Sequence, residues 1–145
     1  MRLPASCNAS RRALCDAGCV DLRCLIVDDN HGFLQAARRF LERDGLTVAG
    51  VASSSADAVR QVERLRPDVV LVDVSLGDES GFELARRLDG DRARGVPVIL
   101  ISTRSEADLA DAIAESTADG FLSKSELSAA AIRGLLDEAN ERRGR

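Results

Sequence analysis

Short apolar runs alternate with amphipathic segments along most of this chain, and no other feature restricts the fold as much. Five such runs are rich in Val, Ile and Leu, as buried strands of a parallel sheet are: LRCLIV, LTVAGVA, DVVLVDV, VPVILIS and GFL. The segments between them repeat their apolar residues with the helical period of roughly 3.6 residues. Because strand–helix–strand crossovers are right-handed, the sequence predicts an α/β fold of the doubly wound (βα)5 type, with a five-stranded parallel sheet and helices on both faces.

Local signals mark where several helices begin and end. Ser54 stands three residues before Asp57, which is a capping signature, and Ser105 is placed to open a helix over 106–116. The last helix is expected over 125–143. The first helix, expected over 33–45, carries an apolar stripe formed by Phe33, Leu34, Ala37, Phe40 and Leu41.

The first 21 residues show no strand or helix period. They contain Cys7, Cys15 and Cys19, whose spacing does not match the paired CxxC pattern of zinc sites, and the sequence assigns no role to these cysteines. We predict that residues 1–21 are a disordered N-terminal extension, or an artefact of the assigned start if Val20 is the natural initiation residue. Residues 22–145 then form one domain.

Charge and hydropathy exclude some classes of partner. The formal net charge is −4 and the pI is near 5.1, and no stretch resembles a basic recognition helix. This balance disfavours nucleic-acid binding through bulk electrostatics. No apolar run is long enough to cross a bilayer or to form a secretory signal. The sequence therefore predicts a soluble cytoplasmic domain with neither nucleic acid nor membrane as partner.

Polar residues stand where four of the apolar runs end. They are Asp28 and Asp29 after the first run, Asp73 in the third, Ser102 and Thr103 at the end of the fourth, and Lys124 after the fifth. In an open α/β sheet the carboxyl ends of the strands share one edge, and that edge is where ligands bind. We therefore expect these side chains to meet there.

The residue types at this edge suggest phosphoryl chemistry. Three crowded carboxylates repel one another, and a divalent cation that takes oxygen ligands relieves the repulsion. Mg²⁺ fits best, because it keeps several waters and needs only a few carboxylates. Lys124 is the one lysine among 20 basic residues, and it supplies a compact positive charge that arginine does not reproduce. A metal, a cation and a hydroxyl around one carboxylate are the groups that stabilise phosphoryl transfer to that carboxylate.

The chain from about residue 22 to 142 resembles the receiver domain of two-component response regulators, which has a flavodoxin-like fold. By this resemblance Asp28 and Asp29 match the acidic pair that binds Mg²⁺, and Asp73 matches the phosphoacceptor. Lys124 matches the family's lysine. Ser102 matches the hydroxyl position, and the adjacent Thr103 is the alternative.

The resemblance also implies roles beyond the acceptor. Phe121, three residues before Lys124, matches the aromatic switch residue, which is more often tyrosine. The backbone carbonyl of Ser75 matches the third protein ligand of Mg²⁺. Ser75 and Arg104, each two residues beyond a site residue, are expected to flank the attacking water and to tune the decay of the phosphoryl group.

Besides Phe121, three positions depart from the family pattern. Gly77 stands where proline is usual and is expected to loosen the loop beside the site. Thr103 replaces a small residue, and Ser125 replaces the proline that commonly follows the lysine. Because the acidic residues and the lysine stay in place, these departures do not abolish the acceptor chemistry. They put the rates and the strength of the switch in question.

The resemblance implies a phosphoacceptor, with self-dephosphorylation but without turnover as an enzyme. Its partners would be a sensor histidine kinase or phosphotransfer protein and a downstream protein, with homodimerisation left open. Few residues follow the last helix, so we expect a stand-alone receiver with no output domain. The alternative is a pseudo-receiver, an interaction module that works without phosphorylation.

Overall fold

The computed structural model describes residues 22–90 and 96–143 of the chain. The predicted N-terminal extension, with Cys7, Cys15 and Cys19, lies outside the described residues, so its nature stays a prediction. In the described part, no helix combines the length and the apolar character that a membrane span requires.

A five-stranded parallel sheet forms the centre of the molecule, with strand order β2-β1-β3-β6-β7. Its strands are β1 (Arg23–Val27), β2 (Thr47–Ala52), β3 (Val69–Asp73), β6 (Val98–Ser102) and β7 (Gly120–Ser123). All the residues of β3 and β6 are buried, which explains why their sequences are almost continuously apolar. The predicted doubly wound sheet is confirmed.

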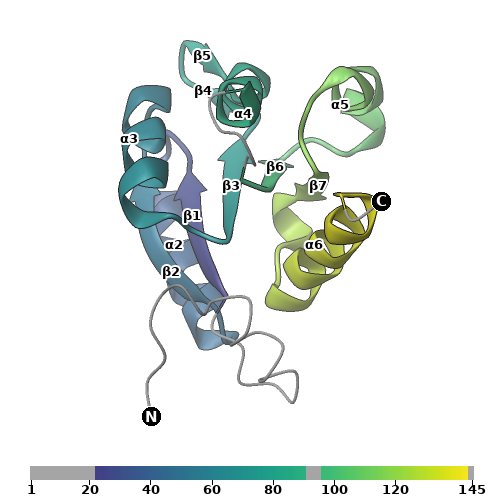
Figure 1. Ribbon diagram of the computed structural model, residues 1–145. Coiled ribbons are helices and arrows are strands. Elements are labelled where there is room, and N and C mark those ends of the chain that lie inside the picture. Colours follow the sequence, from purple (N-terminus) through teal and green to yellow (C-terminus); the bar gives the residue numbers. More distant parts are fainter. Residues whose placement is uncertain (1–21, 91–95, 144–145) are drawn as a thin grey trace.

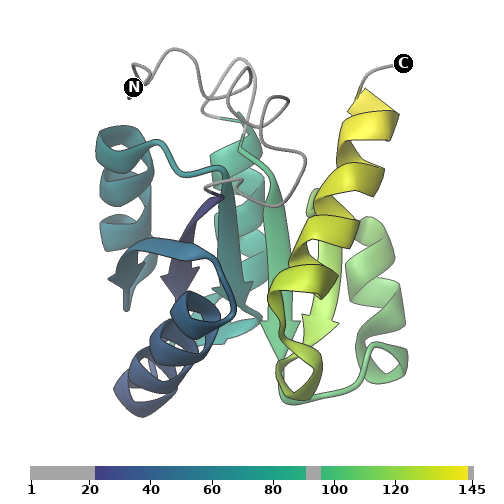
Figure 2. The same ribbon diagram turned by 90° about the horizontal axis from the view of Figure 1, so that it is seen from below.

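Helices cover both faces of this sheet (Figures 1 and 2). Their bounds are α2 (His31–Arg43), α3 (Ser55–Leu65), α4 (Gly81–Gly90), α5 (Ala110–Glu115) and α6 (Ala129–Arg143). Helices α2 and α6 bury one apolar cluster against the sheet, and α3, α4 and the turn before α5 bury the other. Alternate strand residues divide between the clusters: Ile26 faces α2 and α6, whereas its neighbour Val27 faces α3 and α4.

The capping residues of two helices are as predicted. The Ser54 hydroxyl accepts a hydrogen bond of 3.2 Å from the Asp57 backbone N–H at the start of α3. Ser105 likewise accepts from the Asp108 N–H, but it opens a 3₁₀ turn (Ala107–Leu109) that precedes α5. The predicted last helix is too long at its N-terminus, because a separate 3₁₀ turn occupies Lys124–Glu126 and α6 begins only after Ser128.

Phe40 was predicted on the buried stripe of α2, and this is wrong: its side chain is 49% exposed. The buried residues Leu34, Ala37 and Leu41 define the centre of the stripe. With roughly 100° per residue, Phe33 and Phe40 both project from the edge of that stripe. Phe33 is half-buried because it lies beside the sheet edge, whereas Phe40 stands almost two turns further along the helix.

A small hairpin after β3 was not predicted. Strands β4 (Ser75–Leu76) and β5 (Glu79–Ser80) pair antiparallel and lie beside α4 at the top of Figure 1. Gly77 occupies the first turn position with φ of +63°, which favours glycine, as in a type II′ turn. Gly77 therefore closes a defined hairpin, in place of the loosened loop that we expected.

Candidate functional site

Four strand ends place the candidate residues at one edge of the sheet. Asp28 directly follows β1, Asp73 ends β3, Ser102 ends β6 and Lys124 directly follows β7. The strand register keeps these positions level, because Val27 pairs with Val72, Asp73 with Ile101 and Ser102 with Ser123. Residues nearly a hundred positions apart are thus brought together, as the sequence predicted.

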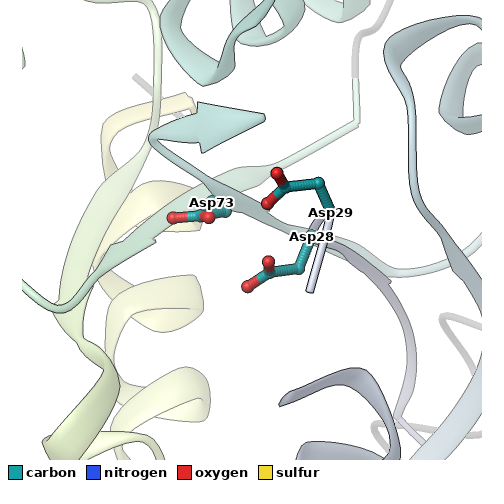
Figure 3. Close-up of side chains that lie close together, drawn as sticks. All are labelled: Asp28, Asp29 and Asp73. Atoms are coloured by element: carbon teal, nitrogen blue, oxygen red, sulfur yellow. The ribbon is translucent and has the colours of Figure 1, made fainter. Parts of the chain in front are cut away.

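Three carboxylates meet at this edge. Oxygens of Asp28, Asp29 and Asp73 all lie within 4.8 Å of one another, and Figure 3 shows the side chains close together. Asp28 is fully buried and Asp73 is 8% exposed, whereas Asp29 lies at the surface. The cluster therefore has a buried base and an open side.

Lys124 supplies positive charge to the buried side of the cluster. Its Nζ lies 2.6 Å from Oδ2 of Asp28 and 3.7 Å from Oδ2 of Asp73. The other oxygen of Asp28 accepts a hydrogen bond of 2.9 Å from the Asn30 backbone N–H. Both oxygens of Asp28 therefore have a protein donor, which a fully buried carboxylate requires.

The negative charge of the Asp73 carboxylate is less fully compensated than that of Asp28. Burial, and after it the negative charge of Asp28, raise the pKa of Asp73 from 3.8 to about 6. Lys124 and a hydrogen bond from the Ser75 backbone lower this pKa and offset part of the rise. In the absence of a further cation, Asp73 is a carboxylate that gains from any added positive charge.

The donor set fits a divalent cation of the Mg²⁺ type. It consists of carboxylate oxygens, with one exposed member and one member of raised pKa, and Mg²⁺ prefers such oxygens while keeping several waters. Asp29 and Asp73 are the members best placed to bind directly, because both oxygens of Asp28 already accept from Lys124 and Asn30.

Comparison with known proteins decides the family. Residues 24–135 match the family model described as the response regulator receiver domain. This chain belongs to the response regulator receiver domain family. The match covers β1 from its second residue on, the other four strands of the sheet and about the first half of α6.

Relatives of known sequence are bacterial regulators. The chain is 34% identical over 112 residues to the transcriptional regulatory protein PrrA of Mycobacterium tuberculosis, covering 75% of this chain and 46% of that one. It is 27% identical over 105 residues to the DNA-binding transcriptional activator EvgA of Escherichia coli K12, covering 72% of this chain and 51% of that one. The chain thus spans about half the length of the curated relatives it matches.

Solved structures show the same receiver fold. A response regulator receiver domain protein from Clostridium thermocellum superposes with a TM-score of 0.68 at 26% identity, covering 85% of this chain and 97% of that one. A CheY-like receiver domain protein from Methanospirillum hungatei gives a TM-score of 0.68 at 22% identity, covering 86% of this chain and 98% of that one.

Ser102, which we expected at the hydroxyl position of the receiver domain, is a buried serine. Ser102 is 5% exposed, and its Oγ accepts a hydrogen bond of 3.0 Å from the Arg104 backbone N–H. Thr103, the alternative, lies beyond the end of β6 and is exposed. The Arg104 side chain is exposed too, so the described contact of Arg104 with the site runs through its backbone.

Phe121, the expected switch residue, and Ser75, two positions after Asp73, differ in environment. Phe121 is 8% exposed and packs in the apolar cluster of α3 and α4, so its ring points inward. Ser75 is exposed at the start of the β4–β5 hairpin. The turn of this hairpin also approaches the acidic pair, because a methyl group placed on Gly77 would lie 3.4 Å from Oδ2 of Asp29.

Sequence reasoning missed two residues that shape the site. Phe33 was assigned to the core stripe, but its ring centroid lies 4.0 Å from Nζ of Lys124. Glu79, in the hairpin, accepts a hydrogen bond of 2.9 Å from the Ser55 backbone N–H at the start of α3. The position of Phe33 could have been inferred, because the first turn of a helix that begins at the sheet edge must lie beside the site.

Proposed function

We propose that this receiver domain accepts a phosphoryl group on Asp73 and signals through a phosphorylation-dependent change in protein binding. One observation carries the proposal: Asp73 is a buried strand-end carboxylate with a raised pKa, 3.7 Å from a lysine and clustered with two further carboxylates. A buried charge cluster of this kind costs stability, and it concentrates the groups that phosphoryl transfer uses.

Asp29, Asp73 and the backbone carbonyl of Ser75 would hold Mg²⁺, with Asp28 acting through water. When bound, the metal supplies positive charge that neutralises the phosphoryl oxygens during transfer. The engagement of Asp28 by Lys124 and Asn30 supports its indirect role.

In the proposed transfer, an oxygen of Asp73 attacks the phosphorus of a phosphohistidine on a sensor kinase or phosphotransfer protein. The new bond joins that oxygen to phosphorus, while the bond from phosphorus to the imidazole nitrogen breaks and its electron pair stays with the nitrogen. Nζ of Lys124 and the hydroxyl of Ser102 then bind the phosphoryl oxygens. Burial favours Ser102 over the exposed Thr103 for this role.

The signal would pass from Ser102 to Phe121. Because Ser102 Oγ already accepts from the Arg104 N–H, a hydroxyl drawn toward a phosphoryl group also pulls on the loop that follows β6. Phe121 is buried here, so the proposed switch is a population shift between this inward position and a more exposed one.

Aspartyl phosphates hydrolyse, so the proposed signal decays without a turnover reaction. Ser75 and Arg104 have exposed side chains, and we propose that both tune the access of water to the phosphoryl group. Replacing either should change the decay rate of the phosphorylated protein more than its rate of formation.

A stand-alone receiver that acts through protein partners, in the cytoplasm and without nucleic acid, stays a prediction. The net charge of −4 supports only the part of it that concerns nucleic acid, whereas the relative EvgA is named as DNA-binding and is about twice the matched length. Homodimerisation on phosphorylation is an alternative output, and sedimentation of the phosphorylated protein distinguishes it from heterologous binding.

Intact mass after incubation with acetyl phosphate and Mg²⁺ tests the proposal. We expect one phosphoryl adduct on the wild type and none on Asp73→Asn. Asp78→Asn is the matched control, because Asp78 is an exposed carboxylate in the nearby hairpin turn and should leave the adduct intact. A wild type that forms no adduct and binds no beryllofluoride would contradict the proposal and favour the pseudo-receiver.

A further inference from the structure

The ammonium of Lys124 is enclosed on more than one side. Carboxylate oxygens of Asp28 and Asp73 lie 2.6 and 3.7 Å from Nζ. The ring of Phe33 lies against the same atom, with its centroid 4.0 Å from Nζ. A cation at this distance from an aromatic centroid is attracted by the negative face of the ring, and more strongly where water is excluded. The Lys124 side chain is only 14% exposed.

The position of Phe33 is fixed by the same short segment that carries the acidic pair. The Asn30 side chain accepts a hydrogen bond of 3.0 Å from the Phe33 backbone N–H, and the Asn30 backbone N–H donates to Asp28. The ring is also half-buried against the cluster beneath α2 and α6. Residues 28–33 therefore hold a carboxylate and an aromatic face in a fixed relation to each other.

A lysine side chain has four rotatable bonds, and an ion pair with Asp28 alone does not determine where Nζ sits relative to Asp73. The ring restricts Nζ from another direction and takes a place that water would otherwise fill. An aromatic face is also a tolerant contact, because it attracts the cation without requiring one hydrogen-bond direction. Nζ can thus exchange one oxygen partner for another while it keeps the ring.

We propose that Phe33 is a positioning residue for Lys124, which holds the ammonium beside Asp73 before transfer and lets it move to a phosphoryl oxygen afterwards. The proposal rests on the proposed function for its consequence, but the contact itself is measurable without any phosphorylation. A merely structural Phe33 would stabilise α2 and leave the lysine environment unchanged.

Lys124 is the only lysine in the chain, so protein labelled with ¹³C,¹⁵N-lysine gives one Cε–Hε signal set. We expect nuclear Overhauser contacts between Lys124 Hε and the Phe33 ring in the wild type, and Hε protons shifted upfield by the ring. Phe33→Leu should move these protons toward their position in the denatured protein, and Phe33→Tyr should restore the upfield shift.

Phe82→Leu is the matched control. Phe82 is likewise half-buried in the first turn of a helix, α4, but it packs on the opposite core cluster. The Phe82→Leu substitution should therefore leave the Lys124 signals unchanged. The absence of ring contacts in folded wild-type protein would overturn the proposal without requiring any variant to fold.

The consequence is tested by the rate of phosphorylation from acetyl phosphate with Mg²⁺. We expect about a fivefold slower rate for Phe33→Leu, and rates near wild type for Phe33→Tyr and Phe82→Leu. A lysine signal that moves with no change in rate would overturn the positioning role. A wild type that is never phosphorylated would instead contradict the proposed function, while the lysine spectrum still decides whether Phe33 holds the ammonium.

Discussion

A buried aspartate stands at the end of β1 and another at the end of β3, and the segments that follow these strands compensate the two charges to different extents. In the segment over 28–33, which runs from the end of β1 into α2, both oxygens of Asp28 have donors within 2.9 Å, one from Asn30 and one from Lys124. The Asn30 side chain also caps the start of α2. In the hairpin over 75–80, the Ser75 backbone donates to Asp73, while the Glu79 carboxylate accepts from the Ser55 N–H instead of contacting the site. Asp73 is left with a pKa near 6.

This difference indicates separate roles for two similar residues. A carboxylate whose oxygens are already engaged costs little to keep ionised, and it can hold a lysine in place. A carboxylate whose burial is only partly compensated is destabilising in itself, and it is stabilised by a metal or by esterification. The first segment therefore supports Lys124, and the second leaves Asp73 with a charge that is only partly compensated, as the proposed phosphoacceptor role requires.

The largest effect is expected where the second segment closes on Asp73. A side-chain carbon on Gly81 would lie 2.1 Å from the Asp73 carbonyl oxygen, and a backbone atom cannot move aside cheaply. Gly81→Ala should lower the free energy of unfolding by about 3 kcal/mol or more, measured by urea denaturation.

Gly134→Ala is its control. This glycine lies within α6 with nothing near its added carbon, so alanine should stabilise the protein by about 0.5 to 1 kcal/mol. Equal stability of Gly81→Ala and the wild type would show that the second segment is not closed tightly on Asp73.

Breaking the ion pair tests the support role of the first segment. Lys124→Met leaves the fully buried Asp28 without its cation, and we expect a loss of about 2 kcal/mol in the free energy of unfolding at pH 7.5. Adding Asp28→Asn to this variant should recover most of the loss. A double variant whose loss equals the sum of the two single losses would argue against the pair.

The pH dependence sharpens the contrast for Asp73. Its pKa rises from 3.8 to about 6 on folding, so the folded protein binds this proton more tightly and loses stability as pH rises through that window. After allowance for solvent screening, metal-free Asp73→Asn should be more stable than wild type by about 1.5 kcal/mol at pH 7.5, and equal to it below about pH 4.

Thermal unfolding across this pH range provides the measurement. At neutral pH, Mg²⁺ should make the wild type more stable than Asp73→Asn. It binds the wild-type carboxylate, and the asparagine variant offers it one carboxylate fewer. An advantage of the variant that persists unchanged at pH 4 would contradict the raised pKa.

The smallest effect is expected at the cap of α2. Asn30→Ala removes the acceptor for the Phe33 N–H and should cost about 1 kcal/mol of unfolding free energy, whereas Asn30→Ser should cost less. The upfield shift of the Lys124 Hε protons should likewise fall more in Asn30→Ala than in Asn30→Ser. Equal shifts in both variants would show that the cap does not position the ring.

The order of elements and the acidic cluster could be predicted because they depend on local patterns. Apolar runs identified every strand of the sheet, and parallel strands bring their carboxyl ends to one edge, so Asp28, Asp73 and Lys124 were expected to meet. The serine caps at Ser54 and Ser105 were predicted for the same reason, since a cap involves residues only three positions apart.

Predictions failed where a residue's environment comes from distant parts of the chain. Phe33 and Phe40 look alike in the helical pattern, yet Phe33 faces Lys124, which directly follows β7, and Phe40 faces solvent. The β4–β5 hairpin is too short to show a strand period, and its contact with α3 joins residues 24 positions apart.

The sequence by itself determined the parallel sheet, the identity of the strand-end residues and their receiver-like order, because periodicity and chain topology suffice for these. Only the tertiary structure decided how charge is shared among them: that Lys124 pairs most closely with Asp28, that Phe33 encloses the ammonium and that Asp73 stays partly uncompensated. The physical reason is that burial and distances of a few ångströms set electrostatic energies, and both arise only when all the strands are assembled.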